Sequence, residues 1–204
     1  MTDLGVTIDS SIKFSQHIGK IVRKAASRCY LIRKCFVSKD TATLVSAFKT
    51  YVRPLLEYNS PVWSPHLLKD ITLIEKVQRR FTKYLKGLYN VSYDERLLAV
   101  NLERLEARRI RCDVITAYKI IFGLTVINCS DFFTFSNSAI STRGHRYKLL
   151  PPSCKCDTRR HCFTSRVVYI WNNLPAGTTD FSSLVKFKNS FNCAFFNRFC
   201  TGEH

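Results

Sequence analysis

Residues 15–36, SQHIGKIVRKAASRCYLIRKCF, decide the fold class because their apolar side chains recur at helical spacing. These apolar positions are Ile18, Ile21, Val22, Ala25, Cys29, Ile32 and Phe36. The other faces carry the basic residues Lys20, Arg23, Lys24, Arg28, Arg33 and Lys34. The segment therefore predicts a basic amphipathic helix.

The next residues predict a second and a third helix. Ser38 or Asp40 can cap the second helix, which Pro54 should end or kink. Residues 54–65 are rich in proline and aromatic residues and favour a turn region. A third amphipathic helix is expected from about residue 69 to residue 88.

Capping patterns predict two more helices. Ser92 and Glu95 have the Ser-x-x-Glu spacing of a capping box, which opens a short helix before Asn101. The longest helix should run from residue 103 to residue 122, with Gly123 as its C-terminal cap. Together these segments predict a mainly α fold.

Composition changes after Gly123 and indicates a separate C-terminal tail module over residues 124–204. In this tail we expect an extended segment at 142–150, an apolar stretch at 162–171, a helix at about 182–199 and a small mixed fold that can include a sheet. At the other end, residues 4–9 alternate like a short strand, which is unstable alone. We therefore expect that the chain begins inside a larger fold or that its true beginning is missing.

The charge predicts a nucleic-acid partner, either RNA or DNA. Lys and Arg number 32 and Asp and Glu number 15, a net charge of +17 that favours phosphate-rich polymers or anionic surfaces. Candidates for phosphate contact are Lys20, Arg23, Lys24, Arg79, Arg80 and Lys83 on the helices, and Arg143, His145 and Arg146 in the tail. The alternative for each helical cation is an ordinary solvent-exposed charge.

Aromatic and basic residues alternate in two segments, FTKY at 81–84 and HRYK at 145–148. Such mixtures stack bases and hold phosphates in single-stranded binding grooves. Core packing explains Phe81 better, because it lies on the apolar stripe of its helix. Tyr147 stays an open candidate for stacking.

The nine cysteines are an odd number in helix-like contexts, which favours reduced thiols and an intracellular protein, nuclear or cytoplasmic. The most apolar run, residues 114–126, contains Lys119 and is shorter than the ~18 to 20 residues that span a bilayer, so no membrane partner is expected. One cluster has metal-ligating side chains: Cys154, Cys156, His161 and Cys162. Its spacing does not match the usual Cys-x2-4-Cys pairing, and we expect neither zinc nor another cofactor.

No catalytic constellation is visible in the sequence. Two-metal phosphoryl transfer needs clustered carboxylates, and no two aspartates of this chain are adjacent. Glycine-rich phosphate loops and a nucleophile elbow are also absent. The chain is therefore not expected to be an enzyme on its own, although a dispersed site assembled by folding stays open.

Several segments follow one another in a recognisable order. They are LGVTID at 4–9 with FSQHI at 14–18, AFKTYVRPLLEY at 47–58 with VWSP at 62–65, IEKVQRRFT at 74–82, SYDERL at 92–97, LEARR at 105–109, TRGH at 142–145 and RVVYIWNNLP at 166–175. Together they resemble the C-terminal part of reverse transcriptases from non-LTR retrotransposons, especially the jockey-like and related LINE clades. The resemblance covers nearly the whole chain.

The resemblance implies a thumb-like helical module at residues 1–90 with a remnant palm strand at 4–9, a helical connector at 91–123 and the tail module. In this family the thumb grips the template–primer duplex, and the tail helps to bind element RNA or target DNA. The Asp-Asp palm, with its Mg, and the endonuclease lie upstream, so the resemblance implies a non-catalytic fragment of an RNA-directed DNA polymerase. The chain also lacks a clear Cys-Cys-His-Cys knuckle.

Two alternatives stay open. The chain can be a stand-alone RNA- or protein-interaction module derived from a transposable element. It can also belong to a polymerase whose palm is supplied by a separate chain or is missing from the gene. A start of the transcript close to Met1 would favour the first, and an in-frame Asp-Asp motif upstream would favour the second.

Overall fold

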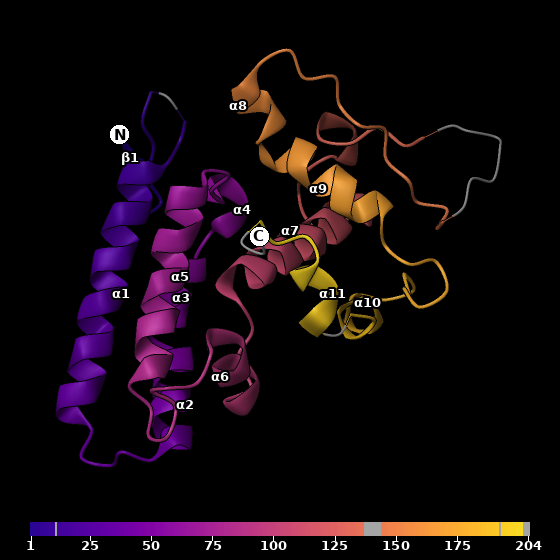
Figure 1. Cartoon of the computed structure of the whole chain (residues 1–204). Helices are drawn as coiled ribbons and strands as arrows, with labels where there is room; N and C mark the ends of the chain where they lie inside the picture. Colours follow the sequence, from indigo (N-terminus) through magenta and orange to yellow (C-terminus); the bar gives the residue numbers. More distant parts are fainter. Residues whose placement is uncertain (11, 137–143, 192, 202–204) are drawn as a thin grey trace. The chain divides into compact units, whose positions relative to one another are not determined.

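The computed structural model describes residues 1–10, 12–136, 144–191 and 193–201. These residues form eleven α-helices, one short 3-10 helix and a two-stranded hairpin, so the predicted mainly α fold is confirmed (Figure 1). Two compact units are present: Met1–Arg109 with the residues from Cys200 onward, and Ile110–Phe199. These two compact units do not test the predicted division into three parts, 1–90, 91–123 and 124–204. That division stays a prediction.

Unit 1 begins with an antiparallel hairpin of β1 (Thr2–Asp3) and β2 (Val6–Thr7). The strand predicted over residues 4–9 is therefore replaced by a turn and a second short strand. Leu4 and Gly5 form the turn, with φ angles of 41° and 83°. Positive φ at both residues is typical of the two-residue loops that match the twist of a hairpin. Val6 is buried in the core of the unit.

Helices α1 (Ser15–Cys35) and α5 (Leu68–Lys83) lie side by side in unit 1 (Figure 1). They run parallel, because contacts join the same ends of both helices. Near the N-terminal ends, Ser15 Oγ donates to Asp70 Oδ2 at 2.6 Å, and beyond the C-terminal end of α5 the Arg33 guanidinium lies 3.3 Å from the centre of the Tyr84 ring. The helix predicted at 15–36 is confirmed. Its 21 residues exceed the 17 of the helix at Leu105–Ile121, so the expectation that the longest helix lies at 103–122 is wrong.

Helix α5 ends at Lys83, five residues before the predicted end at 88. The amides of Tyr84, Leu85 and Leu88 each donate to the carbonyl three residues earlier, which tightens the chain into turns. Gly87 then adopts φ 78° in the left-handed region, where glycine carries no steric penalty.

Helix α2 (Thr41–Tyr51) is capped by Asp40, whose Oδ2 accepts from the Thr43 amide at 2.8 Å. The turn region predicted at 54–65 is wrong in part, because it contains the short helices α3 (Arg53–Glu57) and α4 (Ser60–Trp63). Each has a proline in its first turn, where the missing N–H costs no helical hydrogen bond. The core beneath these helices contains Trp63 and a Phe48–Phe81 stack with ring centres 4.6 Å apart.

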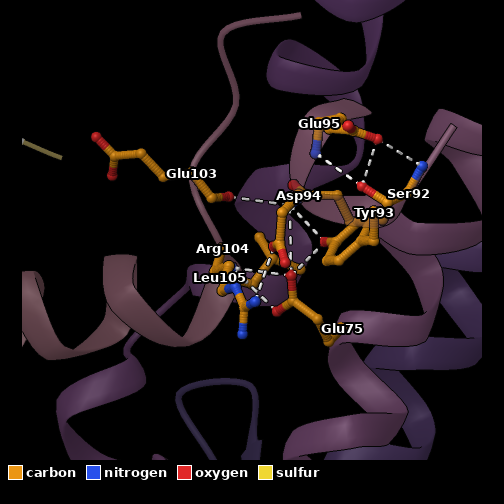
Figure 2. Close-up of polar contacts among 9 residues, drawn as sticks. Glu75, Ser92, Tyr93, Asp94, Glu95, Glu103, Arg104 and Leu105 are labelled. Atoms are coloured by element: carbon orange, nitrogen blue, oxygen red, sulfur yellow. Dashed lines mark hydrogen bonds and ion pairs between the residues drawn. The ribbon is translucent and has the colours of Figure 1, made fainter. Parts of the chain in front are cut away.

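A buried polar network joins α5 to α6 (Tyr93–Ala99) and to the start of α7 (Leu105–Ile121) (Figure 2). The Glu75 carboxylate accepts from the Tyr93 hydroxyl and from the Leu105 amide, the latter at 3.0 and 3.3 Å to its two oxygens. Gln78 donates through Nε2 to the Tyr93 hydroxyl and to the Glu103 carbonyl, at 3.1 and 2.9 Å. The predicted capping box of Ser92 and Glu95 is confirmed at the start of α6.

Unit 2 is built around an aromatic cluster. Its helices are the later part of α7, which ends before Gly123 at φ 66°, then η1 (Cys129–Asp131), α8 (Asp157–Arg160), α9 (Phe163–Asn172), α10 (Leu184–Asn189) and α11 (Cys193–Asn197). Trp171 of α9 and Phe187 of α10 are fully buried, with ring centres 5.8 Å apart. The sheet considered for the tail is reduced, in the described residues, to one bridge between Phe135 and Leu149.

The helix predicted at about 182–199 is divided into α10 and α11. Ser190 lies at the end of α10 and uses its hydroxyl twice: Oγ donates to the Lys186 carbonyl at 2.9 Å and accepts from the Asp180 amide at 2.9 Å. Such side-chain bonds compete with the continuation of a helix. The period of the apolar residues alone did not contain this information.

Unit 2 also holds a charged pair beneath its surface. Arg166 of α9 donates to both oxygens of Asp113 on α7, at 2.8 and 3.1 Å. The Asp113 side chain is almost fully buried. This bidentate geometry ties the two helices together and satisfies a carboxylate that burial alone would destabilise.

Candidate nucleic-acid interface

Three predicted cations of α1, Lys20, Arg23 and Lys24, are exposed. Lys20 Nζ donates to Thr7 Oγ1 at 3.1 Å, and Arg23 Nε donates to the carbonyl of Gly19 at 3.1 Å. Within the described part of the chain, no carboxylate pairs with any of the three. Their charge is therefore available to an external anion.

The three predicted cations of α5, Arg79, Arg80 and Lys83, are exposed as well. The Arg79 guanidinium lies 4.7 Å from the centre of the Tyr93 ring, and Lys83 Nζ lies 4.6 Å from the centre of the Tyr89 ring. Among the described residues none of these cations has an acidic partner either. Aromatic rings, not carboxylates, hold two of them in place.

A groove of about 230 Å³ lies along α1 and α5. Apolar side chains from both helices form its floor, and its charged residues are Arg33, Lys76 and Arg80. Of the six predicted helical cations, Arg80 lines this groove; Lys20 and Lys24 lie on a different face of α1, because successive residues are rotated by about 100° around a helix. The structure thus brings together one predicted cation and two that were not singled out as site residues.

Two tyrosines complete the groove, Tyr30 from α1 and Tyr84 just after α5, and each is 59% exposed. The sequence carried a signal for part of this set: Lys76, Arg80 and Tyr84 follow one another at intervals of four residues and so share a helix face. Their proximity to Arg33 depends on the pairing of α1 with α5, which local spacing does not encode.

The predicted tail residues occupy different environments. His145 is buried, and its Nε2 lies 2.8 Å from the carbonyl oxygen of Trp171. Burial lowers the pKa of His145, so the neutral ring is favoured and its position indicates a structural role. Arg146 is exposed and donates to the Tyr147 hydroxyl at 2.7 Å. Arg143 lies outside the described residues, and contact of all three with nucleic acid stays a prediction.

The cysteine–histidine cluster does not converge on one point. Cys154 Sγ and Cys162 Sγ lie 3.3 and 3.6 Å from the hydroxyl oxygen of Ser165, whereas Cys156 is exposed. His161 Nε2 lies 3.4 Å from a carboxylate oxygen of Asp157. Among the described residues, no three of the four predicted ligand atoms gather within reach of one metal ion. That the chain uses no zinc or other cofactor stays a prediction.

The helices of the described residues include none with both the length and the apolar character needed to cross a bilayer.

Comparisons with known proteins give one relative and no family. No family model matches the chain, and no solved structure matches it. The chain is similar to the uncharacterized protein B0403.1 of Caenorhabditis elegans, with 26% identity over 126 residues. The matched region covers 60% of this chain and 64% of that protein, so the chain spans less than two thirds of its relative.

Proposed function

We propose that the chain is a non-catalytic, nucleic-acid-binding portion of a retrotransposon RNA-directed DNA polymerase, in which unit 1 grips template–primer or target nucleic acid. One observation carries the proposal: the parallel helices α1 and α5 present six exposed cations that lack acidic partners among the described residues. The ordered segments that resemble the thumb and tail of LINE-type reverse transcriptases support the polymerase class.

The proposed grip is electrostatic. Each phosphate neutralised by Lys or Arg releases condensed counterions, so the logarithm of the binding constant falls with the logarithm of the salt concentration by about 0.9 per contact on duplex DNA. If all six cations bind phosphate, the slope is about −5. Cations on two neighbouring helices recognise backbone shape and charge, without a base code.

The test removes the cations of one helix. In a variant with Lys20, Arg23 and Lys24 all changed to Gln, we expect weaker binding of hairpin DNA and hairpin RNA regardless of sequence. The slope of the salt dependence on DNA should become shallower by about 3. Fluorescence anisotropy between roughly 50 and 200 mM salt measures both quantities, because this is the range in which phosphate contacts lose most affinity.

The matched control changes Lys155, Arg159 and Arg160 to Gln. These three exposed cations lie in unit 2, and their loss lowers the net charge by the same amount. We expect this control to bind nearly as the wild type does. A flat salt series for the wild-type chain would rule out the phosphate grip, and an equal loss in the control would remove the interface from α1 and α5.

A further inference from the structure

The floor of the α1/α5 groove is apolar and uncharged. Val22, Ala26 and Cys29 contribute from α1, and Leu73, Val77 and Phe81 contribute from α5. Burial raises the pKa of the Cys29 thiol to about 12, so this side chain stays neutral near pH 7. An apolar, uncharged floor suits the flat face of a nucleobase, because that face is itself uncharged.

The edges of the groove provide stacking surfaces. The Arg33 guanidinium lies 3.3 Å from the centre of the Tyr84 ring, so one face of each group is in contact with the other. Unpaired bases stack on tyrosine rings and on guanidinium planes in single-stranded complexes. Tyr30 is as exposed as Tyr84 and offers a second ring on the α1 side.

The charges of the groove favour a nucleic-acid strand over a protein helix. Arg33, Lys76 and Arg80 are cations, and among the residues that the structure describes no acidic side chain lines the groove. This arrangement is complementary to the phosphates that flank a base.

We propose that the α1/α5 groove receives an unpaired base from a single-stranded segment, with the base against Tyr84 and Arg33 and its phosphates on Lys76 and Arg80. This inference rests on the proposed function and makes it more specific. It assigns a preference for nucleic acid with an unpaired overhang. The grip on the backbone of any duplex belongs to the six exposed cations of α1 and α5, of which Arg80 also lines the groove.

Two hairpins with the same stem test the preference, one blunt and one with a four-nucleotide 3′ overhang that contains 2-aminopurine. Stacking of a base on an aromatic side chain contributes enough to expect about five- to hundredfold tighter binding of the overhang. The 2-aminopurine fluorescence should change when the base leaves its neighbours and enters the groove. Tyr84→Ala should remove the preference and leave the affinity for the blunt hairpin unchanged.

Two further variants separate groove occupancy from folding. Ala26→Leu narrows the groove at an exposed helical position where leucine is well tolerated, and it should reduce overhang binding alone. Tyr51→Ala removes a tyrosine of similar exposure from α2, outside the groove, and should change neither affinity. Circular dichroism establishes that all three variants are folded.

The outcomes distinguish this inference from the proposed function. Equal affinity for blunt and overhang hairpins overturns the inference and leaves the duplex grip standing; no binding of either hairpin overturns both. An equal loss of blunt and overhang binding in Tyr84→Ala also overturns the inference. Binding of an acidic amphipathic peptide that Ala26→Leu abolishes, with no overhang preference, would assign the groove to a protein partner.

Discussion

Replacing Glu75 should destabilise unit 1, because its carboxylate joins three segments of the chain. It accepts from the hydroxyl of Tyr93 on α6 and from the amide of Leu105, the first residue of α7 (Figure 2). The first amides of a helix have no partner within the helix, so Glu75 provides one from outside. Alanine at this position leaves both donors without their acceptor.

The magnitude follows from these two hydrogen bonds. Bonds to a charged acceptor contribute about 1.5–3 kcal/mol each, a gross loss of roughly 3–6 kcal/mol. The loss is offset in part because the buried carboxylate is itself costly, as the raised pKa of Glu75 indicates. We therefore expect Glu75→Ala to lower the free energy of unfolding by about 2–4 kcal/mol, and Glu75→Gln, which keeps one carbonyl oxygen, by about 1–2 kcal/mol.

Urea unfolding followed by circular dichroism measures the loss, and hydrogen exchange in peptides from residues 68–109 locates it in unit 1. A double-mutant cycle with Tyr93→Phe isolates the bond between the two side chains. The reasoning is refuted if Glu75→Ala unfolds within about 0.5 kcal/mol of the wild type, because surface substitutions that remove no special contact have effects of that size. It is also refuted if the extra exchange appears only outside these peptides.

Three further results are expected. Because burial raises the pKa of Glu75, its contribution to the stability of unit 1 is complete below about pH 4.5 and decreases as the pH rises through the raised value; urea titrations of Glu75→Gln should show a flatter pH profile. Burial lowers the pKa of His145, so the unfolded chain binds the proton more readily than the folded chain, and unit 2 should lose stability as the pH falls below about 6.5. Hydrogen exchange of unit 2 peptides would detect this loss. Unchanged protection at lower pH would contradict the prediction. Asp113→Asn removes the charge that faces Arg166 in a buried pair and should cost about 3–5 kcal/mol in urea unfolding; a change below about 1 kcal/mol would show that the pair contributes little.

Local signals in the sequence predicted much of the fold. Asp40 and the Ser92–Glu95 box cap helices because their side chains bond to amides three residues away. Gly123 follows the end of α7 because it adopts the left-handed conformation. The prolines at 54–65 predict a turn region when they are read only as residues that end a helix. In the structure, Pro54 and Pro61 each lie in the first turn of a short helix, where proline is well accommodated.

The candidate site was less accessible to sequence reasoning. Periodicity correctly separated the buried face of α5 from its exposed cations, including Arg80. It did not show that Arg33 and Tyr84 meet, because that contact requires α1 and α5 to pack in parallel with matching ends. Likewise, His145 reads as a polar residue in a basic segment, and its burial against Trp171 depends on tertiary packing in unit 2.

The neutral thiol in the floor of the groove has a practical consequence for labelling. Alkylating reagents react with thiolates, and a thiol with a pKa near 12 offers almost none at pH 7. Maleimide dyes should therefore attach to the exposed Cys35 and Cys156 well before they reach Cys29. A derivative that keeps Cys29 and Cys156 and lacks the other cysteines would carry its fluorophore in unit 2 and leave the floor of the groove chemically unchanged.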